Sequence, residues 1–160
     1  MPRWMATEED EREAVQRLLV GLSSGQDVFG LSATIADLHH KNDTFPGEVY
    51  IRLAAEVLAD TSAAGAGPIG YEGLREVHLE EFEFRGRENR KFQYAVLCSA
   101  SLAGGLEPDL LDEVVWWGTD DFWRYALLAT VALIRASAAA RQVAVEDVVA
   151  ELALRRSVKL

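Results

Sequence analysis

The three histidines are the side chains of this sequence best suited to acid–base or metal chemistry. His40 follows Asp37 by three residues, so one helical turn would bring a carboxylate and an imidazole together, and Glu56 and Asp60 follow on the next apolar stretch. Helical bundles that bind two irons instead use paired Glu-x-x-His motifs, and this sequence contains none. We therefore interpret His39 and His40 as surface residues at a helix end and predict no metal ligands.

The residue types needed for catalysis occur without their usual partners. His78 stands three residues before Glu81, a spacing suited to general acid–base work. Tyr71 and Phe82 share its expected helical side, which favours a histidine at the edge of the core. Cys98 has no activating neighbour in sequence. We predict no catalytic residue, and the sequence favours a protein that is not an enzyme.

Two short motifs resemble ligand-binding sequences but lack the required context. Gly65, Gly67 and Gly70 are spaced like a glycine-rich loop, yet no strand precedes them and no Lys-Ser/Thr follows to balance a phosphate. The acids Asp120–Asp121 could hold magnesium, but they follow a threonine at an expected helix start, where acids stabilise the positive end of the helix dipole. We therefore predict no cofactor.

Basic residues are concentrated in one segment of an otherwise acidic chain. The glutamate-rich segment 72–83 is followed at once by four cations, namely Arg85, Arg87, Arg90 and Lys91. One interpretation is a set of ion pairs within a helix, such as Glu83 with Arg87. The other is a docking patch for an acidic partner or a phosphate, because arginine forks bind both.

Five aromatic side chains lie close together around a predicted helix–turn–helix, namely Trp116, Trp117, Phe122, Trp123 and Tyr125. Successive residues of a helix point about 100° apart, so Trp116 and Trp117 cannot both enter the same part of the core. An exposed tryptophan is a typical interface residue. We therefore predict that Trp116, Trp117 and Trp123, with the basic segment, contact a partner.

A pocket is the alternative use of the same region. The stretches 88–103 and 122–139 are apolar on nearly every side and are expected at the centre of the fold. They could enclose a binding site or an active site for a small molecule between Tyr94 and Tyr125, with His78 nearby, as helical bundles do.

Apolar residues recur at helical spacing through most of the chain. The pattern predicts helices over 7–23, 28–41, 46–58, 71–82, 88–103, 108–117, 122–139 and 145–154. About eight helices favour a compact orthogonal bundle forming one domain over residues 1–160, with a flexible break at 62–68. A short HEAT- or armadillo-like solenoid is the rival architecture, because helix pairs recur from residues 27, 71 and 107.

Composition restricts the partners and the cellular compartment. The 160 residues carry a formal charge of −10, which disfavours binding to nucleic acids or to anionic membranes. The single cysteine allows no disulfide within the chain, and no secretory leader or membrane-spanning apolar run is present. We expect a cytoplasmic protein.

The chain resembles short uncharacterised helical proteins of actinobacterial genomes from Phe82 to Ala136. The resemblance is carried by "FRGRENRKFQYAV", "GGLEPDLLDEV" and "WWGTDDFWRYALLATVALIRA". It implies a bacterial, cytoplasmic setting and transfers no activity or residue role. The sequence therefore predicts a non-enzymatic helical interaction or regulatory module, which binds a protein partner or a second copy of itself.

Overall fold

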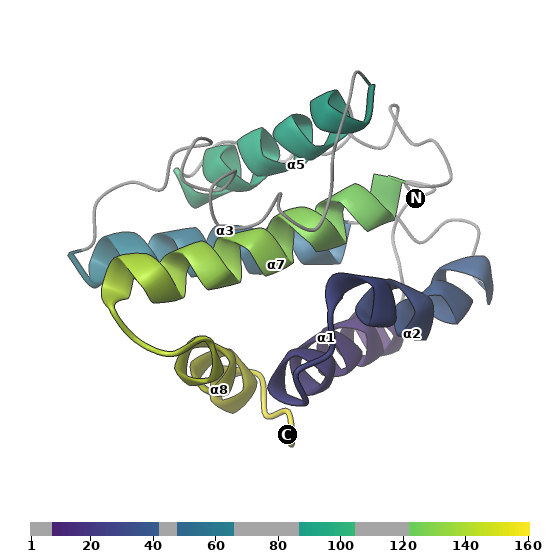
Figure 1. Ribbon diagram of the computed structural model, residues 1–160, viewed down its shortest axis with the longest axis horizontal. Coiled ribbons are helices and arrows are strands. Elements are labelled where there is room, and N and C mark those ends of the chain that lie inside the picture. Colours follow the sequence, from purple (N-terminus) through teal and green to yellow (C-terminus); the bar gives the residue numbers. More distant parts are fainter. Residues whose placement is uncertain (1–7, 42–47, 66–86, 105–121) are drawn as a thin grey trace.

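The computed structural model describes residues 8–41, 48–65, 87–104 and 122–160, and within these ranges every regular element is an α-helix. The helices are α1 (Glu8–Ser23), α2 (Val28–Lys41), α3 (Glu48–Ala63), α5 (Arg87–Ala103), α7 (Phe122–Arg141) and α8 (Val145–Arg155) (Figure 1). The prediction of an all-α protein is confirmed for these residues. The helices predicted at 71–82 and 108–117 lie outside the described residues, as do positions 66–68 of the predicted break.

Local signals set the ends of several helices. Asp27 caps α2, where its carboxylate accepts a hydrogen bond of 2.7 Å from the backbone N–H of Gly30. After α1 the chain reverses through Gly25, whose φ of 75° is the left-handed conformation that glycine favours. After α7 the predicted turn at Arg141 and Gln142 is confirmed, and Gln142 itself has a φ of 57°.

Three helices, α3, α5 and α7, contact one another and form the upper part of the molecule in Figure 1. Tyr50 lies in the first turn of α3 and Thr130 midway along α7, and the Thr130 hydroxyl is 2.7 Å from the carbonyl of Tyr50 and 2.8 Å from that of Ala126. Near their ends, the Thr61 and Ser137 hydroxyls lie 2.5 Å apart. Residue numbers rise together along both helices, so α3 and α7 run parallel.

The other three described helices lie beneath this group in Figure 1. There α1 contacts α2 and α8, while α8 and α2 both reach α7. Because other helices cover α7 above and below, its side chains are buried nearly all round, as its sequence predicted. Its exposed positions include Arg124, Ala139 and Ala140.

The companion prediction for 88–103 needs correction. Phe92, Ala95 and Cys98 of α5 are buried against the neighbouring helices, but Leu97 is 57% exposed and Ala100 is also exposed. The reason is position: α5 is the outermost of the three upper helices, so only one of its sides meets the core (Figure 1). Its apolar residues therefore do not all lie inside the protein.

None of the described helices is by itself long and apolar enough to cross a membrane. Only α7 and α8 taken together reach that length and composition, and they are bent by 114° relative to each other.

Candidate partner-binding surface

The fold brings one residue of the basic segment, Lys91, onto one of the five clustered aromatic residues, Tyr125. Lys91 lies near the start of α5, and its Nζ is 5.2 Å from the centre of the Tyr125 ring near the start of α7. An ammonium group at this distance from an aromatic ring is attracted by the negative ring face, an interaction of about 0.5–1 kcal/mol at exposed sites. The starts of α5 and α7, which are far apart in the sequence, therefore lie at the same end of the α5–α7 pair.

Trp123 occupies the same end of α7 but lies mainly inside the protein. Its side chain is 5% exposed, and the guanidinium carbon of Arg124 lies 5.3 Å from the ring centre. In the isolated chain this tryptophan offers little surface, whereas Arg124 is exposed beside it. The role of Trp123 as a partner contact stays a prediction.

The outer side of α5 continues this surface along the helix. Gln93, Leu97 and Ala100 are exposed and follow the spacing of one helical side. Tyr94 is half-buried and packs against the edge of the core, while Leu97 is 57% exposed. We call Gln93, Leu97 and Ala100 the α5 outer stripe. Sequence reasoning missed Leu97, although its position away from Phe92, Ala95 and Cys98 was the available signal.

The structure places only the backbone of some predicted site residues and does not describe others. Arg87 and Arg90 belong to the first turns of α5. The remaining predicted contacts and the third predicted pocket residue lie outside the described residues, namely Arg85, Trp116, Trp117 and His78.

Two of the carboxylates first considered as metal ligands, Glu56 and Asp60, bind arginines. The Arg155 Nη1 atom donates to Glu56 at 2.5 Å and to Asp60 at 2.9 Å, and Arg156 donates to the other oxygen of Glu56 at 2.5 Å. The hydrogen bond to Asp60 has the largest effect on the pKa of Arg155, followed by the hydrogen bond to Glu56, and both raise it. This cluster ties α8 to α3. Among the described residues, no group of three or more His, Cys, Asp and Glu side chains is arranged to hold a metal ion.

Residues 21–25 read G-L-S-S-G, which has the G-x-S-x-G spacing of a nucleophile elbow. An elbow requires a strand-to-helix turn, but here Ser23 ends α1 and a turn into α2 follows. The Ser24 hydroxyl donates to the carbonyl of Val20 at 2.8 Å, as serines near helix ends often do. The segment therefore terminates a helix.

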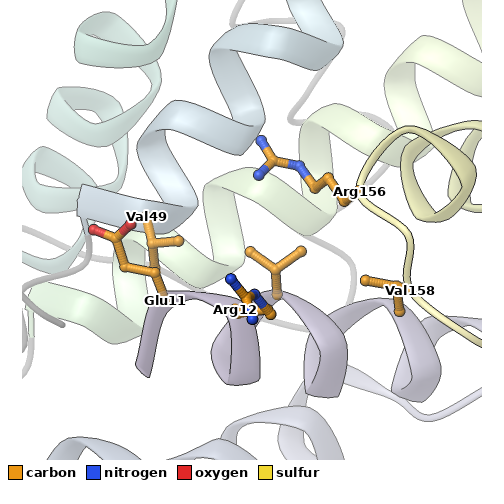
Figure 2. Close-up of a pocket in the computed structure, with 6 residues that line it drawn as sticks. Glu11, Arg12, Val49, Arg156 and Val158 are labelled. Atoms are coloured by element: carbon orange, nitrogen blue, oxygen red, sulfur yellow. The ribbon is translucent and has the colours of Figure 1, made fainter. Parts of the chain in front are cut away.

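Two cavities lined by described residues lie away from the α5–α7 pair. One is formed where α1, the start of α3 and the end of α8 meet, and is lined by Glu11, Arg12, Val15, Val49, Arg156 and Val158 (Figure 2). The other lies between α1 and α2, and there Arg17 donates to Glu13 at 2.6 Å and to the carbonyl of Thr34 at 3.0 Å. The predicted pocket between Tyr94 and Tyr125 stays a prediction, with Tyr125 only 9% exposed beneath Lys91.

Comparison of the chain with protein-family models, with curated proteins and with solved structures gave no match.

Proposed function

We propose that this protein is a non-enzymatic helical interaction module and that the first turns of α5 and α7, together with the α5 outer stripe, form its contact surface. The observation that carries the proposal is an exposed leucine on α5, the helix whose first turns are basic and contact an aromatic ring of α7. Leu97 is 57% exposed, and Lys91 is held over Tyr125 at the start of that helix. Leucine provides apolar area and the cations provide orientation, which is the usual division of roles at an interface.

The chemistry of the surface supports one class of partner. A chain of net charge −10 has gathered Arg87, Arg90 and Lys91 in two turns of one helix, with Arg124 exposed nearby on α7. A partner segment with acidic side chains and one apolar face would complement this arrangement. A second copy of the chain meets the same requirement if an acidic helix such as α1, which begins with Glu8, Glu9 and Asp10, contacts the basic turn.

The proposal extends to the architecture and the setting. We propose one compact bundle of about eight helices working in a bacterial cytoplasm, in line with the resemblance described above. A contact between α1 and α8 supports a bundle over a solenoid, because stacked repeats contact only their neighbours along the chain.

The test replaces Leu97 with glutamine and uses Leu154→Gln as the matched control. Leu154 is 83% exposed on α8, so both substitutions remove an exposed leucine and should leave folding intact. Association of the purified chain is measured by sedimentation over a range of concentrations. If the chain sediments as a monomer, the partner is sought by cross-linking in cells, and the cross-linked residues are identified.

We expect Leu97→Gln to weaken association about tenfold, since burying half a leucine side chain contributes roughly 1–1.5 kcal/mol. Leu154→Gln should have no effect. Added salt should weaken association of the unmodified chain, because exposed charges are screened beyond about 8 Å at physiological ionic strength. Equal effects of the two substitutions, or cross-links that avoid α5, would disprove the proposed surface.

A further inference from the structure

The α5 outer stripe combines one large apolar side chain with small residues towards the end of the helix. Leu97 is 57% exposed, and Ala100, one turn further on, is exposed as well. Gly104 follows α5 directly and is also exposed. A Cβ added there would lie 3.5 Å from the carbonyl oxygens of Ala100 and Ser101, which is an ordinary contact. The end of the stripe is therefore low enough for a second helix to approach closely.

The charges of α5 oppose its own helix dipole. Its first five residues include Arg87, Arg90 and Lys91 with only one acid, Glu88, and its last turn contains no basic residue. Cations stabilise the negative C-terminal end of a helix and are unfavourable at its positive N-terminal end. Excess positive charge therefore lies at one end of α5, while its own residues place no cation at the negative end.

The two ends of α5 complement each other if a second α5 lies antiparallel to the first. Each basic start then lies beside the negative end of the other helix. Leu97 of each copy lies against Ala100 of the other, so a large side chain meets a small one twice. In a parallel pair, by contrast, Leu97 would face Leu97 and the two basic starts would repel each other.

We propose that the partner of this surface is a second copy of the chain, packed α5 against α5 in antiparallel orientation about a two-fold axis between Leu97 and Ala100. The inference rests on the proposed function, and it names both the partner and the helix that the partner contributes. Two-fold symmetry closes this assembly as a dimer, because each copy uses the same side of α5 once.

Two cysteine variants distinguish this arrangement from other packings of α5. About such an axis, Gln93 lies opposite Gly104 of the second copy at the usual spacing of packed helices, about 8–10 Å. Two copies of Gln93 are separated along the pair by the distance from 93 to 104, about 16 Å at a rise of about 1.5 Å per residue. A short bismaleimide should therefore link Gln93→Cys to Gly104→Cys in a mixture and give no dimer of either variant alone. Cys98 is 0% exposed, so the unmodified chain should give no product.

The outcomes separate this inference from the proposed function. A product from the mixture alone supports the antiparallel pair. A product from Gln93→Cys alone shows a parallel pair and overturns the inference, as does a mixture that gives no product. A chain that sediments as a monomer, yet is cross-linked through α5 to another protein in cells, refutes the second copy and leaves the proposed function standing.

A charge placed in the last turn of α5 tests the electrostatic part of the argument. Ser101 is half-buried there. Ser101→Lys supplies a cation at the negative end of its own helix, so the dilute chain should resist urea slightly better, but the new cation repels the basic start of the second copy. Association measured by sedimentation should weaken about threefold in Ser101→Lys and tighten by a similar factor in Ser101→Glu. Changes of the same sign in the two variants would overturn the proposed pairing.

Discussion

The buried hydroxyl pair between α3 and α7 makes a quantitative prediction about how these helices are held in register. Thr61 and Ser137 are 2% and 0% exposed, and their oxygens lie 2.5 Å apart. Thr61 Oγ1 also lies 2.7 Å from the carbonyl of Val57. A hydroxyl has one hydrogen, and that carbonyl can only accept, so Thr61 donates to Val57 and Ser137 donates to Thr61.

The direction of the bond makes the two single substitutions unequal. Thr61→Val keeps the side-chain shape but leaves the Ser137 hydroxyl buried without its acceptor, which costs about 1–3 kcal/mol. Ser137→Ala removes only the donor, and Thr61 keeps its bond to Val57, so the cost is about 0.5–1.5 kcal/mol. The double variant leaves no unsatisfied hydroxyl, and its loss should be smaller than the sum of the single losses by about 1 kcal/mol.

Urea unfolding of the four proteins in this double-mutant cycle measures the free energies directly. Ser99→Ala is the control, because Ser99 is equally buried and, among the described residues, bonds to the carbonyl of Ala95 in its own helix. Its effect should add to that of Thr61→Val. Additivity between Thr61→Val and Ser137→Ala within about 0.3 kcal/mol would refute the reasoning, since Ser137 would then be satisfied within its own helix.

Three further predictions test other parts of the structure. Gly21→Ala should lower the free energy of unfolding, because the new Cβ would lie 2.3 Å from a methyl of fully buried Leu31. This clash should outweigh the helix preference of alanine over glycine, about 1 kcal/mol. Thermal unfolding measures the change. Glu151→Gln should cost a few tenths of a kcal/mol at neutral pH. The hydrogen bond from Arg141 lowers the pKa of Glu151 below 4.5, so its contribution exists above that pH and is lost as the pH falls through the lowered value; urea unfolding on both sides of this range checks the sign. Burial raises the pKa of Tyr50, and the charge of Arg17 opposes this rise only in part. Absorbance titration should therefore show one tyrosine that ionises only when the protein unfolds. This signal should be missing in Tyr50→Phe.

The helices were largely predictable because each one buries a stripe of side chains at local spacing. The predicted stretches 28–41, 88–103 and 122–139 agree with α2, α5 and α7 to within two residues at either end. The ends follow local chemistry too, such as Asp27 before α2 and the turn at Gln142. These signals lie within a few residues of the structure that they determine.

The arrangement of the helices was not predictable in the same way, because it depends on contacts between distant residues. Nothing near Lys91 indicates that it lies over Tyr125, and nothing near Glu56 indicates that two arginines of the last helix bind it. The apolar composition of 88–103 fitted a central helix equally well, and only the packing of α5 on one side leaves Leu97 exposed. The cavity at Arg12 and Arg156 likewise joins segments that are far apart in sequence.

The parallel pairing of α3 and α7 also governs when this protein can begin to fold during its synthesis. The bonded residues Tyr50 and Thr130 are 80 positions apart, and Glu56 and Arg155 are 99 apart. At about 5–20 residues per second, a ribosome needs on the order of ten seconds after completing α3 before α7 emerges. During that time the apolar side of α3, with Leu53 and Val57, has no α7 to cover it. The nascent chain therefore exposes this apolar side until α7 emerges, and a chain ending before residue 122 has no α7 to cover it.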